Sequence, residues 1–149
     1  MKKWISLFFL AFGVLGFQSD DFRKERYEMV ERQIKDRGIN DSSTLNAFRE
    51  VERHKFVKGK YIDQAYADRP LPIGHGQTIS QPYIVAYMTE VIEPDSNDVV
   101  LEIGTGSGYQ AAILSKIVAE VYTIEIIPEL ANSADNRLKR LDYENVTVK

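Results

Sequence analysis

Two acidic residues flank a glycine-rich turn in the second half of the sequence. Glu102 stands just before a G-x-G-x-G run made by Gly104, Gly106 and Gly108, and Glu125 ends the next apolar run. Glycines let the backbone approach a ligand closely, and a helix that follows them offers unpaired N–H groups. An acid at the place of Glu125 can accept hydrogen bonds from both ribose hydroxyls of a nucleoside. The pattern therefore predicts a cofactor that contains a nucleoside.

The spacing of the glycines distinguishes between two kinds of cofactor. A dinucleotide loop has the form G-x-G-x-x-G, whereas this loop continues into Tyr109 and Gln110, where that fingerprint needs small residues. Glu102 would also repel a pyrophosphate but attract a cation or an ammonium group. These features favour S-adenosylmethionine, whose sulfonium and amino groups are positive, and they match the first motif of the class I methyltransferases. The alternative is that Glu102 only ends a strand and the glycines only form a tight turn.

The elements around this loop follow the pattern of a parallel sheet covered by helices. The apolar run at 99–103 is typical of a buried parallel strand, and the residues after the loop have the pattern of a helix. The same alternation continues to the last residues, with a helix at 109–118, a strand at 121–125, a helix at 128–141 and a strand at 146–148. We therefore predict an α/β fold that contains the first half of a doubly wound, Rossmann-like sheet.

The residues before the sheet are predicted to be helical, with one loop-rich interruption. A charged amphipathic helix is expected over 21–37, ending at Gly38. A second helix, capped by Asn40 or Asp41, places its apolar residues on one face. These are Leu45, Phe48 and Val51. Residues 56–80 lose the helical period and collect prolines and glycines, which predicts a long structured loop, and a third helix begins near Pro82.

Composition excludes several kinds of site. The chain of 149 residues has a net charge of −3, no cysteine and only two histidines. Disulfides, thiolate metal sites and cysteine nucleophiles are therefore excluded, and a histidine-rich metal site is not expected. No basic stripe is present that would neutralise a phosphate backbone, so nucleic acid is not the expected partner.

The first residues have the layout of a secretory signal. Lys2 and Lys3 precede an uncharged stretch at 4–17. As a helix this stretch would cover about 21 Å, less than the roughly 30 Å of a membrane core, so no stable membrane span is expected. We predict a signal peptide at 1–19 and an exported protein, periplasmic or secreted. The alternatives are an uncleaved anchor, a buried N-terminal helix or a cytoplasmic protein.

Two blocks of sequence resemble one family in particular. The block L-P-I-G-H-G-Q-T-I-S-Q-P-Y at 71–83, read together with V-L-E-I-G-T-G-S-G-Y-Q at 100–110, is closely similar to protein-L-isoaspartate O-methyltransferases. The resemblance begins near residue 25 and includes V-E-R-H-K-F-V at 51–57. Many methyltransferases share the glycine loop, whereas the first block is characteristic of this family. The resemblance implies a class I methyltransferase domain from residue 20 onward, with a lead-in at 20–93 and the cofactor-binding sheet at 94–149.

The resemblance also implies a reaction and a set of site residues. The reaction is methyl transfer from S-adenosylmethionine to the α-carboxylate of L-isoaspartyl residues in damaged proteins, without a metal, by an enzyme that is a monomer at full length. Ser80 corresponds to the catalytic hydroxyl. The residues that correspond to the cofactor site are Gln77, Thr78, Ile79, Ser80, Glu102, Gly104, Gly106, Gly108 and Glu125.

The chemistry of such a reaction suits a chain poor in histidine. A carboxylate is already ionised at neutral pH, so the nucleophile needs no general base, and the enzyme has to align it and exclude water. The Ser80 hydroxyl can hold the carboxylate by one hydrogen bond. Spacing alone favours Ser80 as a cap of the helix near Pro82, and the two roles are compatible. His75 is not expected to be catalytic, and His54 is expected on a solvated face.

The family's fold needs more strands than this sequence supplies. Only three strands are predicted, and the strand at 99–103 would have a bare apolar edge, which favours aggregation. We therefore expect the sequence to be the N-terminal part of a longer protein, the alternative being a truncated gene product. Two other functions remain open: a methyltransferase with another acceptor, and a fragment that binds without activity of its own. Tyr61 and Tyr66 are candidates for substrate contact.

Overall fold

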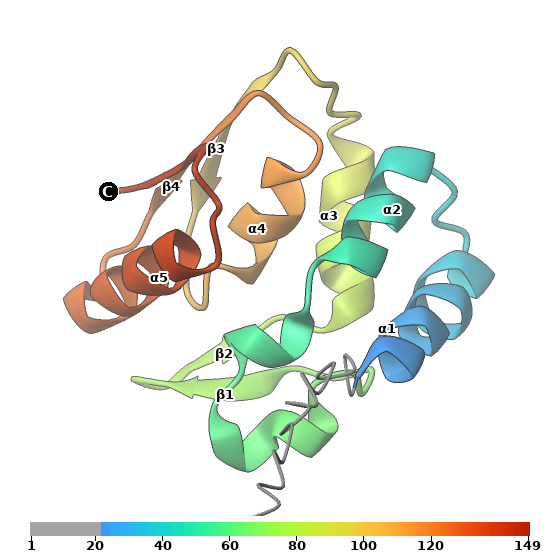
Figure 1. The fold of residues 1–149 in the computed structure, drawn as a ribbon, viewed down its shortest axis with the longest axis horizontal. Helices are drawn as coiled ribbons and strands as arrows, with labels where there is room; N and C mark the ends of the chain where they lie inside the picture. Colours follow the sequence, from blue (N-terminus) through green and yellow to red (C-terminus); the bar gives the residue numbers. More distant parts are fainter. Residues whose placement is uncertain (1–21) are drawn as a thin grey trace, which may run out of the picture.

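A layer of helices stands beside a small parallel sheet, and one helix, α4, lies between them (Figure 1). The structure is a computed structural model that describes residues 22–149. The predicted signal peptide at 1–19 lies outside the described residues. Within 22–149, none of the helices has the length and apolar character needed to cross a membrane.

The first helix is continuous but changes its winding. It begins as α1 (Arg23–Met29), passes through a π-helical turn, η1 (Val30–Ile34), and ends in a short 3-10 turn, η2 (Lys35–Arg37). Gly38 ends it with a φ of 99°, a left-handed conformation that glycine adopts at little cost. The predicted helix at 21–37 is therefore confirmed for 23–37, with a π turn and a 3-10 turn in its second half.

The second helix, α2 (Ser42–Glu50), begins at a side-chain cap. Asp41 Oδ2 accepts a hydrogen bond from the backbone N–H of Thr44 at 2.7 Å. The predicted apolar face, formed by Leu45, Phe48 and Val51, is buried. Asp41, and not Asn40, is the cap.

The segment predicted as a loop contains a β-hairpin. Two 3-10 helices, η3 (Arg53–Phe56) and η4 (Gly59–Gln64), precede β1 (Leu71–Gly74), which pairs antiparallel with β2 (Gln77–Ile79). The prediction of a loop-rich segment at 56–80 was wrong for these two strands, because Pro72, Gly74 and Gly76 break up their alternating pattern. Burial still follows the strand pattern, because the apolar side chains of Leu71, Ile73 and Ile79 are buried. The hairpin leads into α3 (Pro82–Val91), which starts at Pro82 as predicted.

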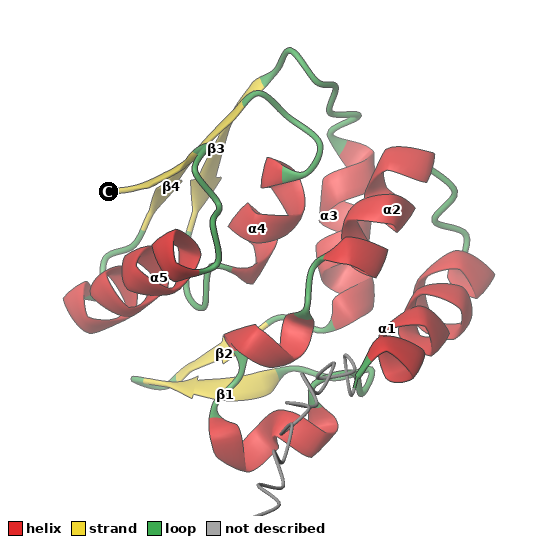
Figure 2. Cartoon of the chain, viewed as in Figure 1, coloured by secondary structure: helices red, strands yellow, loops and turns green. Residues whose placement is uncertain are grey.

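The second half of the chain has the predicted alternation of strands and helices (Figure 2). The three strands are parallel and lie in the order β3-β4-β5. Their bounds, with those of the intervening helices, are β3 (Val99–Ile103), α4 (Tyr109–Ser115), β4 (Glu120–Ile124), α5 (Pro128–Arg140) and β5 (Val146–Val148). This is the α/β architecture of the first half of a doubly wound sheet.

Within residues 22–149, helices cover only one face of the sheet. Helix α4 packs on β4 and β5, and α5 packs on β5, so that Val121 and Thr123 are buried. On the other face Val99, Leu101 and Ile103 are 60% to 74% exposed. The expectation that 99–103 is a buried strand is therefore wrong for this face, because no described element packs on it. The predicted bare apolar edge of β3 is confirmed by its place at the end of the strand order.

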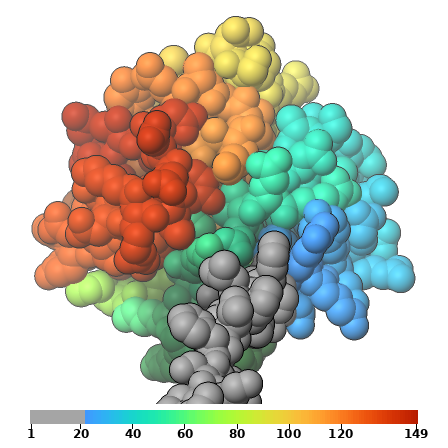
Figure 3. All heavy atoms as spheres, viewed as in Figure 1, coloured from blue at the N-terminus to red at the C-terminus, as the bar shows by residue number. Residues whose placement is uncertain are grey.

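The two halves of the fold share one core, and Tyr109 lies in it. Its ring meets those of Phe48 and Phe56 in edge-on contacts, with centroids 6.0 Å and 5.5 Å away. In the view of Figure 3 the C-terminal residues (red) and the first described helix (blue) lie on opposite sides, with the residues between 40 and 60 separating them. The segment that contains α2 and η3 therefore joins the helical layer to the sheet.

Candidate cofactor and active site

The glycine loop leaves β3 and is held against the end of β4. The backbone N–H groups of Gly104 and Thr105 both donate to the carbonyl of Ile124, at 2.7 Å and 3.2 Å. The N–H of Gly108 donates to the carbonyl of Thr105 at 2.7 Å and closes the turn before α4. The loop is therefore a fixed structure attached to the neighbouring strand.

The glycines of the loop have positive φ angles, 96° at Gly104, 52° at Gly106 and 83° at Gly108. Side chains also have little room at two of these positions. A Cβ at Gly106 would lie 3.3 Å from Ile73 Cδ1, and one at Gly108 would lie 3.2 Å from Leu138 Cδ1. Backbone conformation therefore favours glycine at 106 and 108, and a side chain at either position would also press on a neighbouring side chain.

Glu125 closes the loop from the next strand. Its Oε2 accepts a hydrogen bond from the backbone N–H of Gly106 at 2.8 Å, and its Oε1 accepts one from Ile127 at 2.9 Å. Glu125 therefore holds the glycine loop and the start of α5 at the same carboxylate. This carboxylate lies at the carboxyl end of β4, where ligands bind in open α/β sheets.

Glu102 lies inside the site with a perturbed acidity. Burial raises the pKa of Glu102 to about 7; a hydrogen bond from Thr123 opposes the shift, and the nearby charge of Glu125 adds to it. Thr123 Oγ1 donates to Glu102 Oε2 at 2.6 Å and lies 2.7 Å from Thr105 Oγ1. When Glu102 is ionised, the Thr123 hydroxyl donates its hydrogen bond to the Glu102 carboxylate. The Thr105 hydroxyl is then the donor to Thr123 Oγ1. A carboxylate held in this way favours a positively charged ligand.

These elements enclose a cavity of about 450 Å³, a size usual for small-molecule sites. Its walls come from four places: the end of β2, the glycine loop with the strand before it, the inner side of α3, and the side of α4 that carries Tyr109, Gln110 and Leu114. The predicted site residues in its lining are Thr78, Ile79, Ser80, Glu102, Gly104 and Gly106. The apolar lining includes Val85, Met88, Ile92, Leu101 and Ile103.

Three predicted cofactor residues do not line this cavity. Gln77 is exposed at the start of β2, and Gly108 is buried against α5. Glu125 reaches the site through its hydrogen bond to Gly106. The structure thus brings six of the nine predicted residues together and places one more, Glu125, in contact with the loop.

Ser80 offers its hydroxyl to the cavity. The residue is exposed and lines the cavity, and its hydroxyl makes no hydrogen bond with any of the residues 22–149. The cap of α3 is Gln81, with no side-chain hydrogen bond to the helix. The alternative that Ser80 caps this helix is therefore wrong, and its hydroxyl is available to a ligand.

The histidines and the candidate tyrosines lie elsewhere. His75 occupies the hairpin turn with a φ of 52° and is exposed. His54 was expected on a solvated face but is half-buried, with Nδ1 2.8 Å from Tyr66 Oη and its ring 4.7 Å from that of Phe22. Neither Tyr61 nor Tyr66 lines the cavity. No group of side chains suited to hold a metal ion occurs within the described residues.

The sequence did not indicate that Arg53 contacts the Ser80 segment. Arg53, at the start of η3, is fully buried, and it donates to the backbone carbonyl of Ser80 at 2.7 Å. Its position in a charged run, beside Glu52 and His54, predicts a surface residue. No pattern in the sequence indicates its burial, because the partners that bury it are distant along the chain.

Comparison with known proteins identifies the family. A sequence model described as protein-L-isoaspartate(D-aspartate) O-methyltransferase (PCMT) matches residues 24–149. The chain belongs to this family. A protein-L-isoaspartate O-methyltransferase from a Picosynechococcus species is 56% identical over 124 residues, which are 83% of this chain and 56% of that protein. The chain therefore spans a little over half the length of this relative.

Solved structures of the family share the fold. One protein-L-isoaspartate O-methyltransferase superposes with a TM-score of 0.73 and 29% identity, covering 85% of this chain and 41% of the other. A Plasmodium falciparum protein described as a PCMT, in complex with S-adenosyl-L-homocysteine, gives a TM-score of 0.69 and 26% identity, covering 83% of this chain and 62% of the other. The fold is thus that of a class I methyltransferase, of which this chain contains part.

The residues present fit an S-adenosyl cofactor. Glu102 provides a half-buried carboxylate that suits a positive charge, and the carboxylate of Glu125 stands at the end of the next strand, where the ribose of a nucleoside is bound in such folds. Gly104, which lines the cavity, has open space where a Cβ would stand, so its backbone can be approached. The donor set and the backbone cradle therefore match a nucleoside that carries a cationic group.

Proposed function

We propose that this chain forms the cofactor site and part of the substrate site of a protein-L-isoaspartate O-methyltransferase. The observation that carries the proposal is one cavity lined both by Ser80 and by the glycine loop with Glu102. The family match supports the same reaction, which is methyl transfer to the α-carboxylate of L-isoaspartyl residues in damaged proteins.

The chain's own residues would hold the cofactor in three ways. Glu102 would face the positive charge, the loop at Gly104 and Gly106 would contact the cofactor through its backbone, and Glu125 would accept hydrogen bonds from the ribose. S-adenosylmethionine, when bound, supplies an activated methyl group on a sulfonium. No metal is part of the proposal.

Ser80 is the residue that we propose for the substrate carboxylate. This carboxylate is ionised at neutral pH, so a hydrogen-bond donor that orients it suffices and no base is needed. The hydroxyl of Ser80 is uncommitted within the described part of the chain and lines the cavity beside the glycine loop. The apolar side chains of α3 in the same lining, Val85 and Met88, would help to exclude water.

The proposal is tested by methyl transfer from labelled S-adenosylmethionine. The 149-residue chain is incubated with a peptide containing L-isoaspartate and, as the matched control, with the same peptide containing aspartate. We expect transfer to the first peptide only. Equal labelling of both peptides would indicate a methyltransferase with another acceptor. Tight binding of S-adenosyl-L-homocysteine without transfer would assign to this chain the cofactor site alone, and absence of both would overturn the proposal.

We also propose that the protein is exported. The support is the sequence of the first residues, in which Lys2 and Lys3 precede an uncharged apolar stretch. Fusion of residues 1–25 to a reporter that is active only outside the cytoplasm tests this proposal. We expect activity of the reporter, and activity lost when Lys2 and Lys3 are kept but the apolar stretch is deleted. A fusion that stays inactive would place the protein in the cytoplasm.

A further inference from the structure

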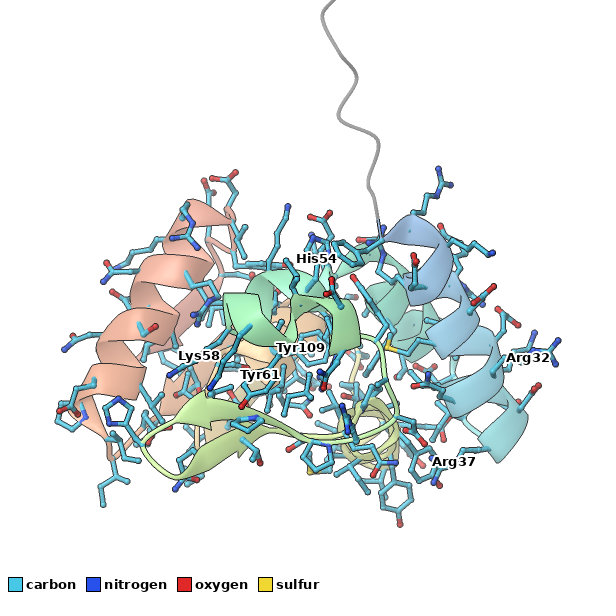
Figure 4. All side chains as sticks on the ribbon, turned by 90° about the horizontal axis from the view of Figure 1, so that it is seen from below. Arg32, Arg37, His54, Lys58, Tyr61 and Tyr109 are labelled. Atoms are coloured by element: carbon cyan, nitrogen blue, oxygen red, sulfur yellow. The ribbon has the colours of Figure 1, made fainter. Side chains whose placement is uncertain are left out.

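Arg53 is a buried cation without a carboxylate partner among the described residues. Its side chain is 0% exposed, and none of the ion pairs within 22–149 includes it. Arg32 and Arg37, in contrast, lie at the surface (Figure 4). A buried charge is costly unless hydrogen bonds compensate it, and an apolar side chain of similar volume would fill the space at lower cost. An apolar residue could fill this space but could not donate hydrogen bonds. We therefore look for the role of Arg53 in the hydrogen bonds that its guanidinium donates.

The guanidinium joins three segments that are distant in the sequence. Nε donates to the carbonyl of Ala65 at 2.8 Å, and Nη2 donates to the carbonyl of Ser80 at 2.7 Å. Its central carbon lies 4.8 Å from the centre of the Tyr109 ring, within the range of a cation–π contact. Tyr109 begins α4 directly after the glycine loop, and it lies inside the molecule beside the hairpin and the η3–η4 segment (Figure 4). One side chain therefore connects the Ser80 segment to the first residue after the glycine loop.

Ser80 lies between β2 and α3, outside both elements. It follows β2, so it lies outside the hydrogen-bonded register of the hairpin, and it precedes the first residue of α3. Its hydroxyl has no partner within the described residues, whereas its carbonyl is held by Arg53. The contact thus fixes the backbone of Ser80 and leaves its hydroxyl free to meet a ligand.

We propose that Arg53 is a positioning residue, which holds the Ser80 backbone so that the hydroxyl faces the glycine loop across the cavity. Its effect on catalysis rests on the proposed function; its effect on the Ser80 segment does not. The planar guanidinium is suited to this task because two of its nitrogens reach two carbonyls in fixed directions while its central carbon lies over the Tyr109 ring. Lysine has a single ammonium group and cannot reproduce this geometry.

The first test measures the Ser80 segment directly. Amide hydrogen exchange is compared for the wild-type chain, Arg53→Lys, Arg53→Met and the control Met29→Ala, which removes a fully buried side chain of α1. We expect exchange at 77–84 to become about tenfold faster in the Arg53 variants, with residues of α5 unchanged. In the control Met29→Ala, we expect the ratio of the exchange rates at 77–84 to those in α5 to stay as in the wild-type chain. Uniform acceleration across the core, or no change at 77–84 in Arg53→Lys, would overturn the proposal.

The second test asks whether Arg53 acts through Ser80. In the methyl-transfer assay we expect Arg53→Lys to lower kcat by about tenfold to a hundredfold, with the Kd of S-adenosyl-L-homocysteine changed less than about threefold. In the Ser80→Ala background the same substitution is expected to lower kcat by less than about twofold, because the hydroxyl that it positions is gone. Equal effects in both backgrounds would contradict a role through Ser80. A wild-type chain without methyl transfer would count against the proposed function, while the exchange measurement would still decide the role of Arg53.

Discussion

Glu125 Oε2 accepts a hydrogen bond from the backbone N–H of Gly106 at 2.8 Å, so the acid that ends β4 closes the glycine loop that follows β3. The other oxygen of the same carboxylate accepts from Ile127 at the start of α5. Glu125 thus has a structural role in the loop and also stands where a ribose would bind. Because both roles use the same carboxylate, a substitution of Glu125 is expected to affect the loop and the ribose site together.

Glu125→Gln is predicted to weaken binding of S-adenosyl-L-homocysteine by about tenfold to a hundredfold. The amide has one acceptor oxygen instead of two, so it cannot hold both backbone N–H groups, and charged hydrogen bonds contribute about 1.5–3 kcal/mol each. Isothermal titration calorimetry measures the change. The matched control is Glu129→Gln, an exposed acid in the first turn of α5, which should leave the affinity within about twofold. Equal losses for both variants would show that only the overall charge matters.

Affinity for the same ligand is predicted to rise with pH through about 7. The pKa of Glu102 is raised to about 7, mainly by burial, so its ionised fraction grows from about a tenth at pH 6 to about nine-tenths at pH 8. Since only the carboxylate attracts the ligand's ammonium group, affinity should increase by up to about tenfold over this interval.

The control for this pH dependence is Glu102→Gln. This variant should bind more weakly at pH 8 and show a flat profile between pH 6 and pH 8, because the titrating group is absent. A profile that still rises in Glu102→Gln would assign the dependence to another group. A flat profile in the wild-type chain would show that Glu102 does not meet the cationic part of the ligand.

Ser80→Ala is predicted to lower kcat for methyl transfer by about tenfold to a hundredfold. The substitution removes the hydroxyl that we propose to orient the substrate carboxylate, which costs about 1.5–3 kcal/mol for a charge-assisted hydrogen bond. Cofactor affinity should change less than about threefold, because the glycine loop and Glu102 are untouched. Ser96→Ala, at an exposed turn before β3, is the control and should retain full activity. Unchanged kcat in Ser80→Ala would remove Ser80 from the reaction.

Gly108→Ala is predicted to lower the free energy of unfolding by about 1–3 kcal/mol. An alanine there would adopt a left-handed φ of 83° and place its Cβ 3.2 Å from Leu138 Cδ1. Urea denaturation followed by circular dichroism measures the change. Gly59→Ala is the control, because nothing lies within 4 Å of a Cβ there and no left-handed φ is required. A loss at Gly59 as large as that at Gly108 would contradict the packing argument.

Local patterns in the sequence were enough to predict most of the helices and the parallel strands. The apolar residues of α2 recur at a spacing that puts them on one side, and burial of Leu45, Phe48 and Val51 follows from that spacing. The glycine turn between an apolar run and a helix predicted the loop after β3. These features depend on residues that are neighbours along the chain, so the sequence carries them directly.

Local sequence patterns did not predict the β1–β2 hairpin or the exposure of one face of β3. β1 and β2 are short, and proline and glycine interrupt β1 and the turn after it. Their apolar side chains, Leu71, Ile73 and Ile79, are buried in the core. The apolar residues of β3 predicted burial on both faces, yet burial of a strand depends on what packs against it. In this structure no described element packs on the face that contains Leu101.

The sequence by itself determined the family, the order of the main helices and parallel strands, and the identity of the loop that a cofactor would meet. The tertiary structure alone decided that Ser80 and Glu102 line one cavity, that Arg53 is buried beneath Ser80, and that Glu125 holds Gly106. The physical reason is that acidity, burial and hydrogen-bond partners depend on distances between segments remote in the sequence. Those distances are set by packing of the whole core, which no single motif specifies.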